Sequence, residues 1–196
     1  MEAGVLGTRQ TEYIAPPIEK SGEKHEEYST VTERYYTPRF AVNVVEKEDD
    51  FCVLFHSNKI CVITLAPSHP ILRLKKEVVD ISFQVSTKVD RSQNKVSGKG
   101  KKGAQILHPN SALCIVKCSD NSKYTLYSCV QGKLVEVNEN LMEKPSLLVS
   151  KPSSSGYIAI ILPNLLKSKQ QKDELLTPEK YEEYLLTHNS ACESKE

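Results

Sequence analysis

Residues 51–65 read Phe51-Cys-Val-Leu-Phe-His56, then Ser57-Asn58, then Lys59-Ile-Cys-Val-Ile-Thr-Leu65. The two outer runs are short, apolar and rich in β-branched residues, which is typical of buried strands. The polar pair between them is a turn signal, although Ser-Asn is a weaker one than Asn-Gly. This stretch therefore predicts a β-hairpin and places the chain in the mainly β class.

Strand signals continue beyond this hairpin. Residues 79–85 read Val-Asp-Ile-Ser-Phe-Gln-Val. This strict alternation predicts a strand with one wet face and one buried face, so Val79 and the apolar residues at every second position after it should be buried. Further strands are expected over residues 112–118, 124–128, 133–137 and 157–162, with a turn at residues 120–122.

The two ends of the chain read differently from this core. Residues 1–33 are polar and charged, and they predict a disordered tail. Residues 34–164 are then the β core with its N-terminal arm. Residues 165–196 should hold a polar linker at 167–172, a short helix and a flexible tail. Thr177 is a good N-cap for that helix, and Pro178 suits its first position.

The composition fits an intracellular protein with a real core. Apolar residues make up 39% of the chain, charged residues 26%, and the formal net charge is +1. This balance gives no general attraction to nucleic acid or membrane. No apolar run is long enough to span a bilayer, and the N-terminus lacks the basic and apolar segments of a signal peptide. We therefore expect no membrane partner, and a cytosolic or nuclear location.

The six cysteines predict reduced thiols rather than disulfides or a metal site. Five of them lie within or beside apolar runs, where a free thiol packs as a small hydrophobic group. There is no C-x-x-C motif, and Cys114 and Cys118 are too far apart along one strand to chelate together. The six are Cys52, Cys61, Cys114, Cys118, Cys129 and Cys192.

A glycine-rich basic segment is the most distinctive local feature. Gly98 to Gly103 matches G-x-G-x-x-G, but only six residues, ending in Pro109, follow it, which is too short for the helix that a dinucleotide site needs. A phosphate-binding loop is excluded because Ala104-Gln105 stands where Lys and Ser/Thr are required. We therefore expect no cofactor.

What this segment offers is positive charge. No acidic residue occurs between Arg91 and Ser119. A flexible basic loop of this kind can contact acidic proteins, phosphates or nucleic acid, and it can equally be a hairpin that lysines keep soluble. No G-x-S-x-G or H-E-x-x-H motif is present, so nothing nominates a catalytic site. The candidate partner-binding residues are Arg91, Lys95, Lys99, Lys101 and Lys102.

Residues 126–141 and 156–163 resemble the second half of the glycine-cleavage H protein, with Val-Glu-Val-Asn before Leu141 and a Gly-Tyr-apolar strand at its end. The resemblance implies a barrel-sandwich hybrid, in which two small sheets fold over each other. In that family a lysine at a hairpin tip carries a lipoyl arm. Lys117 keeps the family's Val-Lys pair but lacks the preceding Glu-Ser and falls within a strand. Lys123 lies nearer the tip but lacks every flanking residue, so lipoylation is disfavoured at both.

Four longer blocks cover residues 58–70, 93–99, 135–140 and 151–159. Together they resemble the Abitram (also called Simiate) family. The resemblance implies a noncatalytic protein that binds actin, modulates filament assembly and cell protrusions, and acts in transcription regulation at nuclear speckles. It implies a location in nucleus and cytoplasm, including actin-rich projections, and partners that are actin and nuclear or transcription-associated proteins.

Two other functions stay open. One is a lipoyl-type carrier, which would use Lys117 or Lys123. The other is a nucleic-acid-binding adaptor that uses the basic loop, although no aromatic residue is interleaved with lysines between residues 91 and 119 to stack on bases. For actin, an acidic protein, a lysine-glycine loop without acids is a plausible complement.

Overall fold

The hairpin expected at residues 51–65 is the centre of the larger sheet. The computed structural model describes residues 30–190, and within it β2 (Phe51–His56) pairs antiparallel with β3 (Cys61–Leu65). Four more strands extend this sheet in the order β1-β2-β3-β11-β10-β7, with every neighbouring pair antiparallel. They are β1 (Tyr36–Ala41), β11 (Ala159–Pro163), β10 (Gly132–Val137) and β7 (Ile106–Leu107).

A second, three-stranded sheet packs against the first. Its order is β4-β8-β9, formed by β4 (Val78–Ser82), β8 (Ala112–Cys118) and β9 (Lys123–Tyr127). A short ribbon of β5 (Gln84–Ser86) and β6 (Val89–Asp90) continues from β4. Fully buried side chains of both sheets, such as Phe51 and Ile63 from one and Leu113 and Leu126 from the other, form one apolar core. The two-sheet architecture expected from the sequence is confirmed.

Val79 departs from the expected alternation. The pairing of β4 with β8 shifts register between Val78 and Asp80, so Val78 takes the buried position and Val79 is 60% exposed. A bulge adds one unpaired residue to a strand, and each residue before it then points to the opposite face. Ile81 and Phe83, beyond the bulge, are buried as predicted.

Short helices connect and cover the sheets. They are α1 (Val31–Tyr35), α2 (Pro70–Arg73), α3 (Asn140–Glu143), α4 (Leu147–Ser150), α5 (Ser168–Glu174) and α6 (Pro178–Ser190). The C-terminal helix is confirmed as α6, and the Thr177 hydroxyl accepts a hydrogen bond from the Lys180 backbone N–H at 3.4 Å. No helix within residues 30–190 is long and apolar enough to cross a bilayer.

Two features at the ends of the core differ from the prediction. Residues 31–33, assigned to the N-terminal tail, lie in α1, and the linker expected at 167–172 is largely helical as α5. Helix α5 is held by its surroundings: the Gln171 side chain accepts a hydrogen bond from Gln131 N at 2.6 Å, and Lys172 lies over the Phe55 ring. The tails predicted over the remaining terminal residues lie outside the described residues.

The cysteines of the described core behave as the sequence predicts. All five are buried and unbonded. Cys114 and Cys118 point into the core from the same face of β8. Burial raises the pKa of the Cys52 and Cys61 thiols to about 12, because a thiolate would be poorly solvated there. These side chains therefore act as apolar packing groups.

Candidate functional site

The basic loop, residues 91–105, connects β6 to β7 and is closed at its base. The Asn94 side-chain amide donates to Leu134 O at 2.8 Å, and its oxygen accepts from Gln105 N at 2.9 Å. Gln105 in turn donates its side-chain amide to Asp90 O at 2.8 Å. Asn94 thus connects the outgoing and returning segments of the loop to each other and to β10. The loop therefore leaves the sheet at a fixed position.

Arg91 belongs to this base and not to the exposed part of the loop. Its guanidinium is half-buried, donating to Ala112 O at 3.0 Å and to the Gln105 side-chain oxygen at 2.7 Å. Burial lowers the pKa of Arg91, because its charge has lost part of its hydration. The sequence grouped Arg91 with the four lysines, whereas the structure assigns it to fastening the loop.

The outer part of the loop is a small closed turn. Ser97 and Lys102 exchange two backbone hydrogen bonds of 3.0 Å, and Lys101 N donates to Gly98 O at 3.1 Å. Gly103 has φ +82°, and a Cβ there would lie 2.7 Å from Lys95 O, so this corner requires glycine. Lys133 on β10 also donates to Gly100 O at 2.7 Å.

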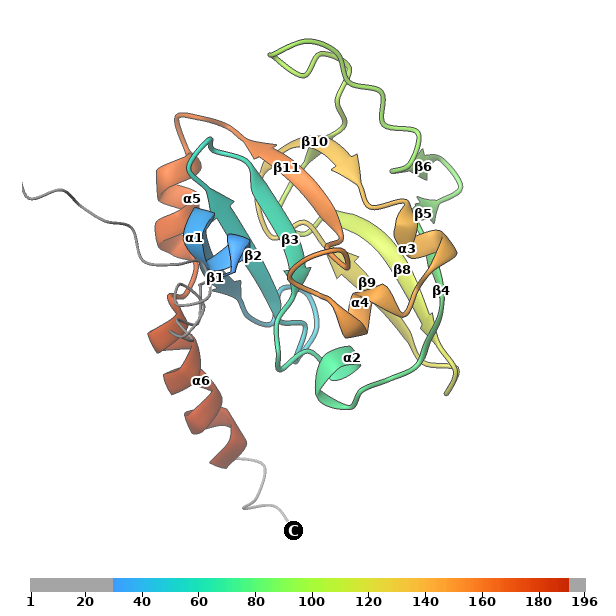
Figure 1. Cartoon of the computed structure of the whole chain (residues 1–196), viewed down its shortest axis with the longest axis vertical. Coiled ribbons are helices and arrows are strands. Elements are labelled where there is room, and N and C mark those ends of the chain that lie inside the picture. Colours follow the sequence, from blue (N-terminus) through green and yellow to red (C-terminus); the bar gives the residue numbers. More distant parts are fainter. Residues whose placement is uncertain (1–29, 191–196) are drawn as a thin grey trace, which may run out of the picture. The chain divides into compact units, whose positions relative to one another are not determined.

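This turn carries the remaining predicted residues together. Lys95, Lys99 and Lys102 are exposed, and Lys101 is half-buried. Because no acidic residue lies within the loop, the amines have no carboxylate on their own segment to neutralise them. The structure therefore places four of the five predicted residues on one basic, hydrogen-bonded turn (Figure 1).

The two lysines considered for lipoylation lie beside the β8–β9 hairpin tip and not on it. Lys117 and Lys123 are register partners across the hairpin, and the connecting residues 119–122 contain no lysine. The Lys117 amine forms an ion pair with Asp80 at 2.9 Å on the neighbouring strand β4. Neither lysine has the hairpin-tip placement that the H-protein resemblance associates with an attached arm.

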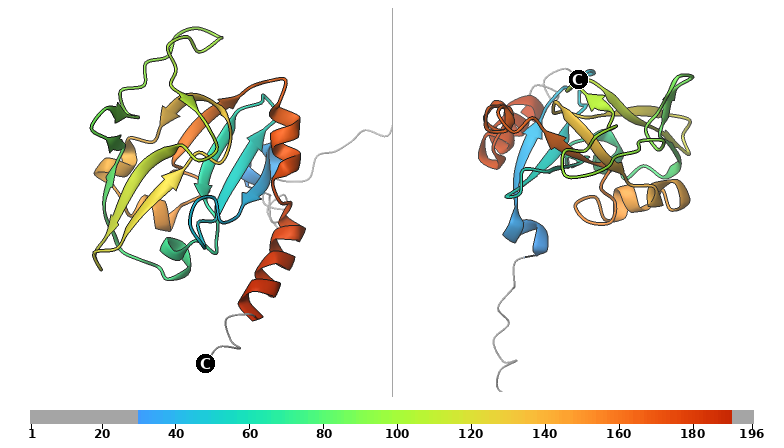
Figure 2. Two further views of the ribbon diagram at one scale, coloured as in Figure 1. Left: turned by 180° about the vertical axis from the view of Figure 1, so that it is seen from behind. Right: turned by 90° about the horizontal axis from the view of Figure 1, so that it is seen from above.

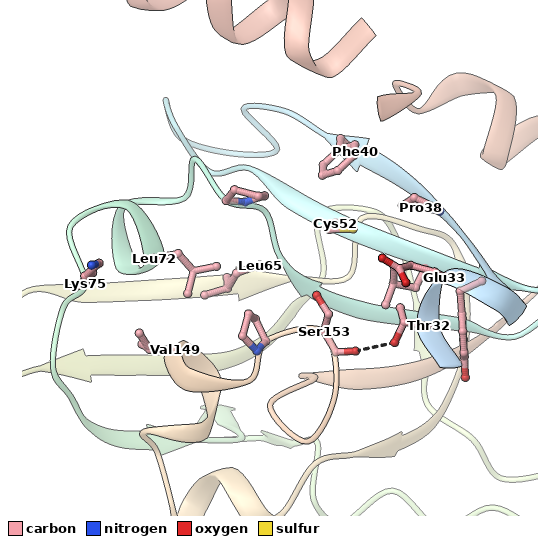
Figure 3. Close-up of a pocket in the computed structure, with 14 residues that line it drawn as sticks. Thr32, Glu33, Pro38, Phe40, Cys52, Leu65, Leu72, Lys75, Val149 and Ser153 are labelled. Carbon is pink, nitrogen blue, oxygen red and sulfur yellow. Dashed lines mark hydrogen bonds between the residues drawn. The ribbon is translucent and has the colours of Figure 1, made fainter. Parts of the chain in front are cut away.

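A groove of about 860 Å³ lies on the outer face of the larger sheet (Figure 3). Its floor includes Cys52, Leu54 and Phe40, which belong to a second apolar cluster separate from the main core. Glu33 and Lys75 are the charged side chains that line it. The sequence could have indicated that this outer face is also covered, because residues 51–55 are apolar at every position, as in a strand that is buried on both sides.

Ser68 and His69 are adjacent in the chain but do not form a nucleophile and base. The Ser68 hydroxyl donates to Asp50 Oδ2 at 2.7 Å and also bonds the Tyr181 hydroxyl, which ties α6 to the core. His69 Nδ1 accepts from Ile71 N at 3.2 Å and caps α2. Within residues 30–190, no three His, Cys, Asp or Glu side chains are placed to hold a metal ion.

Comparison with known proteins supports the architecture. A family model described as Glycine cleavage H-protein matches residues 100–188. The crystal structure of a glycine cleavage system H protein from Mycobacterium marinum aligns with a TM-score of 0.50 at 14% sequence identity, over 73% of this chain and 92% of that one. This likeness confirms the H-protein-like fold.

Sequence relatives give a more specific result. The protein named Abitram of Bos taurus is 50% identical over 158 residues, which cover 80% of this chain and 84% of that protein. The Homo sapiens protein of the same name is 49% identical over 163 residues, covering 83% and 90%. That of Dictyostelium discoideum is 37% identical over 159 residues, covering 79% and 86%. The chain belongs to the Abitram family.

Proposed function

We propose that this chain is a noncatalytic actin-binding protein whose basic loop contacts an acidic surface on actin. The proposal includes modulation of filament assembly and cell protrusions, and a nuclear role in transcription regulation. It takes actin and the nuclear role from the family resemblance, and it takes the contact site from the loop. The chain acts in this view by binding, in cytoplasm and nucleus, without a cofactor.

The observation that carries the proposal is the closed basic turn at residues 95–102. Its backbone is held by the Ser97–Lys102 pair and by the bond from Lys133 to Gly100 O. A turn that is already shaped loses less conformational entropy on binding than a free loop would. Its lysines therefore extend from a backbone of defined shape, which favours a partner with a complementary acidic surface.

The strength of such a contact can be bounded. Exposed ion pairs contribute about 0–1 kcal/mol each, because water and salt screen them. Four lysines alone should therefore give modest affinity. Binding should weaken steeply between ~0.1 M and ~1 M salt, over which the screening length falls from about 10 Å to about 3 Å.

The test is co-sedimentation with actin filaments. Changing Lys99, Lys101 and Lys102 to glutamate should abolish most of the binding and leave the thermal melt unchanged. The matched control is the same charge change at Lys47, Lys144 and Lys151, which are exposed residues outside the loop. Equal pelleting of the loop variant and the parent would refute the proposal. So would an equal loss in the control, since binding would then follow net charge alone.

A further inference from the structure

The turn between β11 and α5 displays two leucines to solvent. Leu165 is 66% exposed and Leu166 is 94% exposed, the highest value among the large apolar side chains in residues 30–190. The turn is ordered, because the Asn164 side-chain oxygen accepts from Leu166 N at 3.0 Å and Asn164 O accepts from Lys167 N at 3.0 Å. An apolar pair held outward in a hydrogen-bonded turn needs a reason other than packing.

The leucine turn and the basic loop flank β10 on its two sides: β11 ends beside Gly132, and β7, which follows the loop, pairs with Gly132 and Lys133. On β10 and β11, Lys133 pairs with Leu162, three residues before Leu165. The same Lys133 donates its amine to Gly100 O in the loop. In Figure 1 and in the left view of Figure 2, both connections project from the upper part of the two-sheet core. Lys133 on β10 thus links the two features.

The turns and strand ends around the leucine turn and the basic loop are free of acidic residues. Residues 57–60, 91–105, 131–135 and 164–172 contain no Asp or Glu. Besides the loop, they supply Lys59 from the β2–β3 turn, and Lys133 and Lys167 beside the leucine turn. β7 adds Ile106, which is 58% exposed and pairs with Lys133. The surface therefore combines separated positive charges with a small apolar projection.

We propose that Leu165 and Leu166 are the apolar anchor of the same interface, and that they insert into an apolar pocket on the acidic protein that the loop contacts. The inference rests on the proposed function, and it adds the group that supplies most of the affinity. Protein interfaces commonly combine a buried apolar anchor with a polar and charged rim, and a few anchor residues carry most of the energy.

A protein partner fits these features better than a lipid bilayer. The leucine turn and the loop are each fixed by hydrogen bonds at their bases, and a stereospecific pocket exploits fixed geometry whereas a fluid surface does not. The chain as a whole carries only +1. Two exposed leucines and this small net charge are not sufficient for stable membrane attachment, which usually requires two strong membrane-binding elements.

The test compares four proteins in co-sedimentation with actin filaments: the parent, Leu165→Ser/Leu166→Ser, the loop variant with three glutamates, and Leu74→Ser/Leu186→Ser. The last is the matched control, because Leu74 and Leu186 are 59% and 73% exposed elsewhere on the molecule. We expect the leucine-turn variant to weaken binding by at least about tenfold. It should melt like the parent and keep the parent's salt dependence.

Each other outcome is decisive. If the leucine-turn variant binds like the parent while the loop variant is weakened, the anchor is refuted and the proposed function stands. If the parent does not pellet with actin filaments, both the proposed function and the leucine anchor are refuted. If the parent binds phosphatidylserine vesicles through Leu165 and Leu166, and actin binding is unaffected by their loss, the surface is a membrane contact and the inference is wrong.

Discussion

His69 should set the acid limit of this fold. The side chain is 0% exposed and lies between the rings of Phe51 and Tyr124, with centroids at 5.6 Å on each side. Because Nδ1 accepts from Ile71 N, the neutral ring carries its proton on Nε2. Protonating Nδ1 would place a charge in this apolar site and would also break the cap of α2.

The magnitude follows from the shift in the pKa of His69. Burial lowers this pKa from 6.5 to about 4. Between these values the unfolded chain binds the proton and the folded chain does not, so the free energy of unfolding falls as pH falls through this window. At ~1.4 kcal/mol per pKa unit, the loss is about 2.5 kcal/mol at pH 4.5 relative to neutral pH, where the stability is complete. Asp49 acts in the opposite direction, because burial raises its pKa and favours its protonation in the folded state.

Urea denaturation of the parent and of His69→Asn at neutral pH and at pH 4.5 tests this prediction. Asparagine keeps an oxygen that can cap α2, but it does not titrate. The variant should be less stable at neutral pH, because it leaves a cavity between the two rings, yet it should lose about 2.5 kcal/mol less than the parent on acidification. Asp49 is present in both proteins, so its contribution cancels in the comparison. Equal losses in the two proteins would refute the reasoning.

Two further predictions concern a tight glycine and the carrier alternative. A Cβ on Gly156 would lie 2.0 Å from Leu147 O, so Gly156→Ala should cost about 3 kcal/mol or more in urea denaturation, whereas Gly100→Ala, which meets nothing within 4 Å, should change stability by about 0.5 kcal/mol or less. Equal stabilities would show that the Gly156 site can relax. Arginine at Lys117 and Lys123 should leave actin binding intact, and the intact mass of the cellular protein should equal that of its sequence. If the parent protein is heavier than its sequence and the arginine variant is not, the lipoyl-carrier function would be supported instead.

The core strands were predictable because their signal is local. Residues 51–65 hold two apolar runs around a turn, and the paired strands β2 and β3 follow directly. The prediction that Val79 is buried was wrong, because the bulge that exposes it depends on how β4 pairs with β8. The alternation of apolar residues within one segment does not encode that pairing. Helix α5 was missed because the segment from Ser168 to Glu174 has neither an apolar stripe nor a side-chain cap, and its contacts with the core hold it.

The proposed binding surface was predictable in charge but not in shape. The acid-free run identified the lysines, yet sequence could not distinguish Arg91, whose half-buried guanidinium fastens the loop base, from the exposed Lys99. Leu165 and Leu166 were missed because sequence alone does not show whether two leucines that follow a strand pack back onto the core or face solvent. Their exposure depends on the strand ending at Pro163 and on the turn that Asn164 then caps, both of which require the folded chain.

The glycine amides provide the most direct test of where the partner binds. Gly98, Gly100 and Gly103 lie in the basic loop, whereas Gly156 is buried between α4 and β11. In an amide NMR titration of the labelled protein with monomeric actin, the three loop glycines should shift or broaden first, and Gly156 should not change. Unchanged loop glycines, with changes at Gly156 or around the groove instead, would contradict the basic loop as the contact site.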